Sequence, residues 1–163
     1  MEMDPDQVYP VREATHLLLE AAIAEVRPTD RVLELGTGSG FIARHLVGKA
    51  ASVVATDVNP HACLVARCPG VGVVRADLTA GIRGPFDLVL CNPPYLPTRP
   101  GERMGDWLEK ALDGGKSGRE VIGTFVRDLP RVLAPGGRVL LVVSELTGTR
   151  EILGLFTEAG FTA

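Results

Sequence analysis

The sequence of 163 residues is poor in the features that mark several special classes of protein. Its three cysteines, Cys63, Cys68 and Cys91, are an odd number without CxxC spacing, which favours reduced thiols over disulfides or a zinc site. Its three histidines are scattered and none has a second ligand at metal spacing, so we expect no bound metal. No apolar run approaches the ~18 residues that a membrane span needs, and the acidic N-terminus does not resemble a signal peptide. These absences predict a cytoplasmic protein without a membrane partner.

An excess of positive charge is also missing. The chain has 17 Lys and Arg against 20 Asp and Glu, which gives a formal net charge of -3 and a pI of about 5.6. Proteins that bind nucleic acids usually carry a basic footprint, so a nucleic acid is disfavoured as the direct substrate. The chain does contain 45% hydrophobic and 23% charged residues. That composition and length predict a single domain over residues 1–163.

Short apolar runs alternate with helical patterns along the chain. Helices are expected at residues 10–27, 40–48, 60–67, 119–133 and 148–159, and strands at 31–36, 51–57, 71–77, 86–92 and 138–146. Strands joined by helical crossovers are typical of a parallel sheet, so we predict a doubly wound α/β domain. The sequence "EAGFTA" stops where another strand would begin, so we expect either a small sheet or, as we favour, a sheet whose C-terminal strands are missing.

Two irregular segments interrupt this pattern. A turn is predicted at residues 135–137, "PGG", before the last strand. A longer segment, about 93–106, is rich in proline, and loops of that length are typically functional or disordered. The long segment directly follows the fourth strand.

The first strand ends in "ELGTGSG", which combines an acidic residue with a glycine turn. Glu34 is followed by Gly36, Gly38 and Gly40, and glycine permits close approach of the backbone to a ligand. Open parallel sheets bind ligands beyond the carboxyl ends of their strands, so a nucleotide-like ligand is expected here. The spacing is GxGxG and not the dinucleotide pattern GxGxxG.

Two more acidic residues end the next two strands. Asp57 can accept both hydroxyls of a ribose, and Asp77 can accept an exocyclic amine. One alternative is that these acids only cap helices or turns. Another is an NAD-type site, which accounts for Asp57 but places Glu34 beside a phosphate that it would repel. S-adenosylmethionine has no phosphate, and this set of residues favours it.

The fourth strand ends in "CNPPYLP". The side-chain oxygen of Asn92 and the carbonyl oxygen of Pro93 can each accept one hydrogen of a planar NH2 group. Pro94 makes the backbone rigid, and Tyr95 can stack on the flat face of the amide or base that carries the nitrogen. Holding both N–H bonds would aim the nitrogen lone pair at a methyl donor, so catalysis would depend on orientation more than on a general base. The alternative is a proline-rich turn that merely ends a strand.

Together these motifs resemble the class I S-adenosylmethionine-dependent methyltransferases of the NPPY type, and within them the HemK-like protein-glutamine methyltransferases. The resemblance runs through "VYPVREATHLLLEA", "ELGTGSG", "ATDVNPHA" and "CNPPYLP". NPPY alone is shared with adenine methyltransferases of DNA and RNA. The stretch "GGKSGREV" is more telling, because it is similar to the GGxxGREV segment of the short archaeal and eukaryotic branch.

The resemblance implies a Rossmann-like sheet of order 3-2-1-4-5. It also implies methyl transfer from S-adenosylmethionine, with S-adenosylhomocysteine as product, to the GGQ glutamine of a class I peptide-chain release factor. Asn92, Pro93, Pro94 and Tyr95 would hold the glutamine amide. The cofactor contacts that it implies are Thr15, Glu34, Gly36, Thr37, Gly38, Gly40, Asp57, Val58, Asp77, Leu78 and Asn92. In the first-helix motif, approximately YxPxEDT, this chain matches at Tyr9, Glu13 and Thr15, but Pro10 is shifted and Ala14 replaces the aspartate.

The resemblance also implies a partner. Members of this branch often work with a small zinc-binding activator protein shared among methyltransferases. The strand at 71–76 would lie at the sheet edge, where exposed apolar residues invite pairing with a strand of another chain. The alternatives are an N6-adenine DNA or RNA methyltransferase and a methyltransferase of another protein substrate such as lysine. A non-catalytic scaffold is disfavoured because the glycine turn, the acids and NPPY all remain together.

Overall fold

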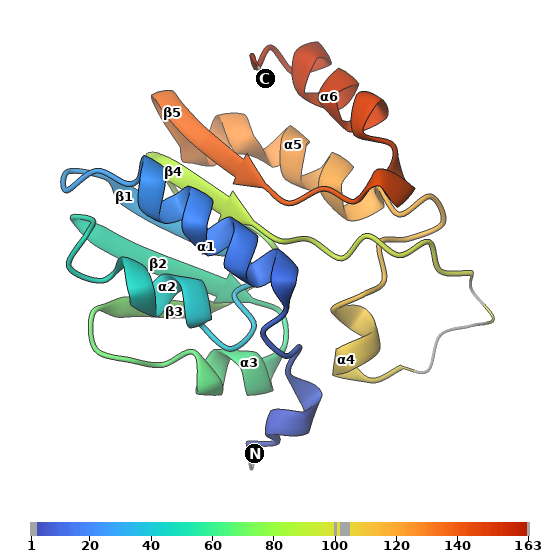
Figure 1. The fold of residues 1–163 in the computed structure, drawn as a ribbon, viewed down its shortest axis with the longest axis horizontal. Helices are drawn as coiled ribbons and strands as arrows, with labels where there is room; N and C mark the ends of the chain where they lie inside the picture. The colour runs from blue at the N-terminus through green and yellow to red at the C-terminus, as the bar shows by residue number, and fades with distance from the viewer. Residues whose placement is uncertain (1–2, 100, 102–104, 163) are drawn as a thin grey trace.

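Five strands form a single sheet around which the chain is wound (Figure 1). The computed structural model describes residues 3–99, 101 and 105–162. The strands are β1 (Arg31–Leu35), β2 (Ser52–Asp57), β3 (Val71–Arg75), β4 (Phe86–Cys91) and β5 (Leu133–Leu141). Their order is β3-β2-β1-β4-β5, and every neighbouring pair is parallel. The predicted fold and strand order are confirmed.

Helices cover both faces of the sheet. The α-helices are α1 (Glu13–Glu25), α2 (Phe41–Leu46), α3 (Pro60–Val65), α4 (Trp107–Lys110), α5 (Glu120–Val132) and α6 (Thr149–Glu158), and the 3-10 helices include η1 (Pro5–Gln7) and η3 (Glu145–Thr147). The five predicted helices are present with shorter bounds, and α4 is an addition inside the irregular region. Among the described residues, no helix has the length and apolar character needed to cross a membrane.

The core has two halves because side chains alternate between the faces of each strand. On one face, α1 and α2 pack through residues such as Leu18 and Ile42 against Val32 and Leu88. On the other face, Leu33 and Val89 of the same strands pack against α5 and α6. The central strands β1 and β4 are therefore buried on both sides, which explains why they are almost continuously apolar.

The last strand differs from its prediction. Expected at 138–146 after a turn, β5 instead starts at Leu133, directly after α5, and ends at Leu141. The "PGG" segment lies inside it as an irregularity, because Phe86 pairs with Leu133 whereas Leu88 pairs with Arg138. The predicted end of the strand forms η3, in which the Ser144 side chain accepts a hydrogen bond from the Leu146 N–H.

The connections determine where a site can form. After β1 the chain crosses to β2 on one side, and β4 lies on the other side of β1. At such a reversal of strand order, the loops leave in opposite directions and open a crevice beyond the carboxyl ends of the strands. The glycine turn after β1 and the segment after β4 meet at this crevice, because Leu35 pairs with Cys91.

Candidate functional site

A cavity of about 300 Å³ lies beyond the carboxyl ends of β1 to β4. It gathers thirteen of the predicted site residues from five separate parts of the chain. They are Thr15, Glu34, Gly36, Thr37, Gly38, Asp57, Val58, Asp77, Leu78, Asn92, Pro93, Pro94 and Tyr95. The structure therefore brings the residues predicted to bind the methyl donor and the NPPY residues into one cavity.

Gly40 is the predicted site residue that does not line this cavity. It precedes α2 with a φ of 74°, and a Cβ there would lie 2.7 Å from the Cα of Ala66. Close packing against the end of α3 thus accounts for glycine at this position.

The glycine turn is fixed to β2 by hydrogen bonds. The Thr37 N–H donates to the Thr56 carbonyl oxygen (2.9 Å), and the Gly38 N–H donates to Oδ2 of Asp57 (2.9 Å). Asp57 also accepts the Asn59 N–H at Oδ1 (2.8 Å). Each carboxylate oxygen retains a further lone pair, so Asp57 can still accept two hydroxyl groups of a ligand. Burial raises the pKa of Asp57.

Glu34 is a buried carboxyl group at the floor of the site, with only 4% of its surface exposed. Its Oε2 accepts hydrogen bonds from the Thr37 hydroxyl (2.8 Å) and the Ala43 N–H (2.9 Å). Burial raises the pKa of Glu34 to about 7, and the nearby Asp57 carboxylate also raises it, whereas the two hydrogen bonds lower it. Two carboxyl groups with raised pKa values side by side favour a ligand that carries positive charge.

The third acidic position is held by an unusual backbone. Leu78, next to Asp77, has a φ of 49°, and it is the one non-glycine residue with positive φ in the described part of the chain. Such a conformation is costly for a bulky residue and persists where surrounding contacts hold it. One of these contacts is the hydrogen bond from the Thr56 hydroxyl to the Leu78 carbonyl oxygen (3.1 Å).

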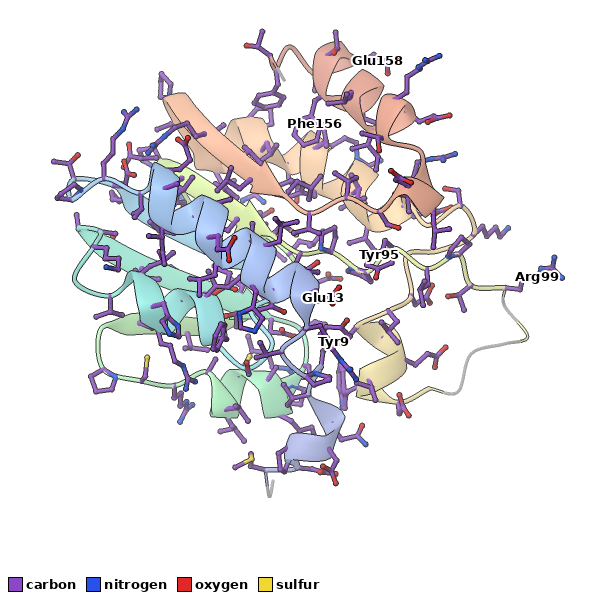
Figure 2. All side chains as sticks on the ribbon, viewed as in Figure 1. Tyr9, Glu13, Tyr95, Arg99, Phe156 and Glu158 are labelled. Atoms are coloured by element: carbon purple, nitrogen blue, oxygen red, sulfur yellow. The ribbon has the colours of Figure 1, made fainter. Side chains whose placement is uncertain are left out.

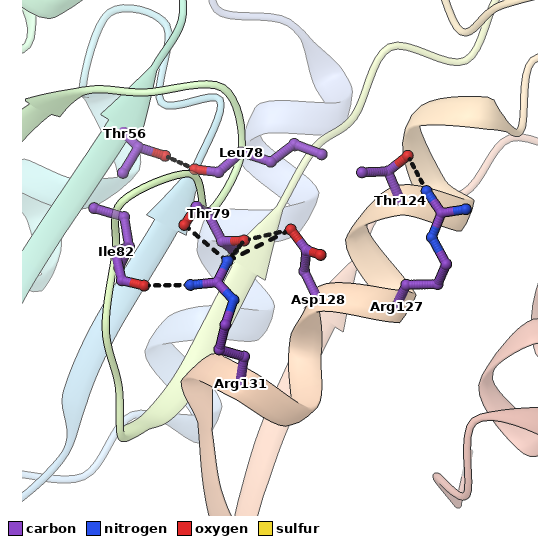
Figure 3. A network of polar contacts seen from close by, with 8 residues as sticks. All are labelled: Thr56, Leu78, Thr79, Ile82, Thr124, Arg127, Asp128 and Arg131. Atoms are coloured by element: carbon purple, nitrogen blue, oxygen red, sulfur yellow. Dashed lines mark hydrogen bonds and ion pairs between the residues drawn. The ribbon is translucent and has the colours of Figure 1, made fainter.

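A polar network fixes the rest of this loop to α5 (Figure 3). The Arg131 guanidinium donates to the carbonyl oxygens of Ile82 (2.6 Å) and Thr79 (3.0 Å). The buried Thr79 hydroxyl accepts from Arg131 (2.6 Å) and donates to Asp128 (2.6 Å), which forms an ion pair with Arg131 (3.6 Å). The network fixes the position of the loop that follows Asp77 and Leu78, and so helps to keep these two residues at the cavity.

The segment "GGKSG" supports the NPPY residues from behind. The Leu96 N–H donates to the Leu112 carbonyl oxygen (3.0 Å), and the Gly114 N–H donates to the Leu96 carbonyl oxygen (2.9 Å). A Cβ on Gly114 would lie 2.9 Å from the Tyr95 carbonyl carbon, and a Cβ on Gly118 would collide with the Tyr95 carbonyl oxygen. The two glycines are thus required for the close passage of this segment behind Tyr95.

Cys91, which precedes Asn92, is not a candidate nucleophile. Its side chain is 1% exposed within the core that faces α5. Burial raises the pKa of the Cys91 thiol far above its usual range, and Glu34 adds to the effect. Cys91 therefore packs as a small apolar residue of the core.

Several other residues of the cavity wall were not among the predicted site residues, although Tyr9 matches the first-helix motif. Tyr9 and Pro10 come from the segment before α1, and Figure 2 shows Tyr9 and Tyr95 at the same edge of the sheet. Trp107 and residues 110–113 form a strap that contributes a further part of the wall. The position of a lone tryptophan next to the long irregular segment was the available signal for this strap.

Residues 10–104 match the methyltransferase small domain family. A Methanocaldococcus jannaschii protein, provisionally named protein N5-glutamine methyltransferase, is 37% identical over 95% of this chain and 81% of its own length. The release factor glutamine methyltransferase of Deinococcus radiodurans is 38% identical over 80% of this chain and 52% of its own length.

A solved structure is also similar over nearly the whole chain. It is the E. cuniculi Mtq2-Trm112 complex, described as responsible for methylation of the translation termination factor eRF1. The matched chain has 33% sequence identity and a TM-score of 0.79, and the match covers 96% of this chain and 86% of that one.

Proposed function

This chain belongs to the methyltransferase small domain family and, within it, to the HemK-like protein-glutamine methyltransferases, and we propose that it methylates the GGQ glutamine of a class I peptide-chain release factor. The methyl donor is S-adenosylmethionine, and the acceptor is the side-chain amide nitrogen. One observation carries the proposal: Glu34, Asp57, Asp77 and the NPPY residues line the same cavity. We propose that the reaction takes place in the cytoplasm.

The polar groups of the cavity fit the donor along its length. Asp57 would hold the two ribose hydroxyls, and Asp77 with the N–H of Leu78 would meet the donor–acceptor edge of adenine. The negative charge near Glu34 suits a ligand with an ammonium and a sulfonium group and opposes a phosphate. Thr15, at the start of α1, would contact the amino-acid end. When bound, the cofactor supplies an electrophilic methyl group.

The residues after β4 would prepare the amide for transfer. An amide nitrogen is a poor nucleophile because its lone pair is delocalised. The Asn92 side-chain oxygen and the Pro93 carbonyl oxygen would each accept a hydrogen bond from one of the two amide N–H groups. Tyr95 would cover the flat face of the amide. This arrangement favours the pyramidal nitrogen and directs its lone pair into the donor half of the cavity, so that catalysis depends on positioning.

A partner at the sheet edge is the second part of the proposal. On its outer side β3 has no neighbour among the described strands, and Val74 there is 41% exposed. Unpaired edges of this kind are suited to addition of a strand from another chain. The similar E. cuniculi protein was solved as a complex with Trm112. We propose that a small zinc-binding activator docks on the β3 edge.

A labelling experiment tests the substrate. The protein, with and without the activator, is incubated with methyl-labelled S-adenosylmethionine and either a GGQ release factor or its GGA variant. Label is expected on the GGQ protein alone, at the glutamine. Label on the GGA variant would assign another protein residue, and label only on DNA or RNA would assign an adenine methyltransferase. Either result would reject the proposed substrate.

A further inference from the structure

Trp107 is the only tryptophan of the chain and the first residue of α4. It is half-buried and forms part of the cavity wall. The contacts of its ring that the structure describes are with two basic side chains, Arg75 and Lys110. Trp107 can therefore contact a ligand in this cavity, and its neighbours indicate which part of the ligand it would face.

The contacts of Trp107 place it at the β2 and β3 end of the cavity. Its backbone N–H donates to Oε1 of Gln7 (3.3 Å), and the backbone carbonyl oxygen of Gln7 accepts from the side chain of Asn59, which follows β2 (2.8 Å). Arg75, at the end of β3, has its guanidinium carbon 6.0 Å from the indole centroid. The Arg75 Nε donates to the carbonyl oxygen of Val58 (3.2 Å).

Those contacts separate Trp107 from the methyl-transfer end. Because β2 and β1 lie between β3 and β4, the ends of β3 and β4 are about 14 Å apart at the usual strand spacing. Val58 and Asn59 directly follow Asp57, and Arg75 precedes Asp77 by two residues. Trp107 therefore lies on the side of the cavity where the two aspartates would hold the adenosine half of the cofactor.

We propose that Trp107 packs its indole against the adenine of the bound cofactor, and this inference rests on the proposed function. Asp57 and Asp77 can hold the edges of adenosine, but the flat faces of adenine need apolar cover, and aromatic rings provide it through stacking. The Lys110 ammonium, 5.4 Å from the indole centroid, and Arg75 hold the ring in position through cation–π contacts.

The single tryptophan allows a direct test with the full chain. S-adenosylhomocysteine, which is not consumed, is titrated into the protein while tryptophan emission is recorded. A saturable change in emission is expected, with the same midpoint as the binding measured by calorimetry. Adenosine alone should change the emission as well, whereas methionine alone should not. Emission that stays constant while calorimetry shows binding would overturn the inference and leave the proposed function intact.

Variants separate contact with the cofactor from a merely structural role. Trp107→Ala should raise the Kd for S-adenosylhomocysteine and the KM for S-adenosylmethionine about 10-fold, while kcat and the KM for the release factor stay within about 2-fold. Trp107→Phe, which keeps an aromatic ring, should raise the same Kd and KM by a smaller factor. Leu108→Ala is the matched control, because Leu108 lies on the same helix but does not line the cavity.

Two further outcomes would reject the inference. If Trp107→Ala raised the KM for the release factor and left the KM for S-adenosylmethionine unchanged, Trp107 would face the protein substrate. If calorimetry detected no binding of S-adenosylhomocysteine to the wild-type chain, the inference and the proposed cofactor would both fail.

Discussion

At the scale of single residues, Asn92 is the side chain on which transfer should depend most. It follows β4 directly and lines the cavity beside Tyr95. Asn92→Ala removes one of the two acceptors proposed to hold the amide, so kcat should fall at least about 100-fold, as when a positioned polar group is deleted from other active sites. The Kd for S-adenosylhomocysteine should change much less. Single-turnover rates and calorimetry measure the two quantities, and unchanged turnover would refute the acceptor role.

Glu34 should make cofactor binding depend on pH near neutrality. Its pKa is raised to about 7 by burial, and a cationic ligand favours the ionised form. The affinity for S-adenosylmethionine should therefore rise from pH 6 to pH 8 as Glu34 loses its proton. Glu34→Gln should bind more weakly at pH 8 and flatten this part of the profile. The neighbouring Asp57, whose pKa burial also raises, remains ionisable in the variant. A profile with the same slope in both proteins would contradict the assignment.

The same raised pKa affects the stability of the ligand-free protein. Between the ordinary pKa of 4.5 and the folded-state value of about 7, folded Glu34 holds a proton that the unfolded chain releases. The free energy of unfolding therefore decreases as pH rises through this window, by up to about 3 kcal/mol, and is constant above it. Urea unfolding at pH 8 should show Glu34→Gln to be more stable than the wild type, which marks the carboxyl group as functional.

How far the sequence predicts the site depends on how each residue is positioned. Glu34, Asp57 and Asp77 could be predicted because they end parallel strands, and such ends meet at one edge of a sheet. Trp107 could not, because its place depends on a hydrogen bond to Gln7, 100 residues earlier in the chain. Gly40 fitted the ligand pattern but packs against Ala66, a contact that no local pattern contains.

At the scale of elements, the "GGKSG" segment and the NPPY segment act as one unit. Gly118 has a φ of 75°, and its missing side chain leaves room for the Tyr95 carbonyl oxygen. Gly118→Ala would add a Cβ against this oxygen in a backbone conformation that alanine adopts poorly. The displaced Tyr95 should lower kcat for the release factor about 10-fold or more, while the affinity for S-adenosylhomocysteine stays close to that of the wild type.

Gly123→Ala provides the control for this substitution. Gly123 lies within α5, and a Cβ there would have no atom within 4 Å. Alanine in a helix is favoured over glycine by about 0.5–1 kcal/mol, so this variant should unfold at a slightly higher temperature and retain activity. Equal kcat values for the two variants would show that close passage behind Tyr95 has no role in transfer.

The strands illustrate where local patterns stop being informative. The pattern predicted β1 to β4 within one or two residues because each is a short, mostly apolar run bounded by turn residues. It placed β5 late because "PGG" is typical of a turn. In the structure the strand starts earlier, because Leu133, before the glycines, pairs with Phe86 of β4. The extra residues of β5 form an irregularity between this pair and the pair of Leu88 with Arg138.

At the scale of the whole molecule, the arrangement of the sheet separates the proposed site of methyl transfer from the proposed partner surface. The candidate catalytic residues lie beyond the ends of the inner strands, whereas the edge of β3, which pairs with no further strand among the described residues, lies along the side of the sheet. The two regions are nevertheless linked, because β3 leads directly into Asp77 and Leu78. A partner on the β3 edge would therefore stabilise the strand that leads into the two residues proposed to bind adenine.

Val74 gives this link a test. Its side chain is 41% exposed on β3, and Val74→Lys would place a charge where a docking partner must exclude water. The variant should lose co-purification with the activator, and its methyl transfer in the presence of activator should fall to the activator-free level. Leu153→Lys is the control, because Leu153 is similarly exposed, at 45%, but lies on α6. This helix packs against α5, and no contact between it and β3 is described. A Val74→Lys protein that still co-purifies with the activator would place the partner elsewhere. Activity of the wild-type chain that is complete without any partner would remove the need for one.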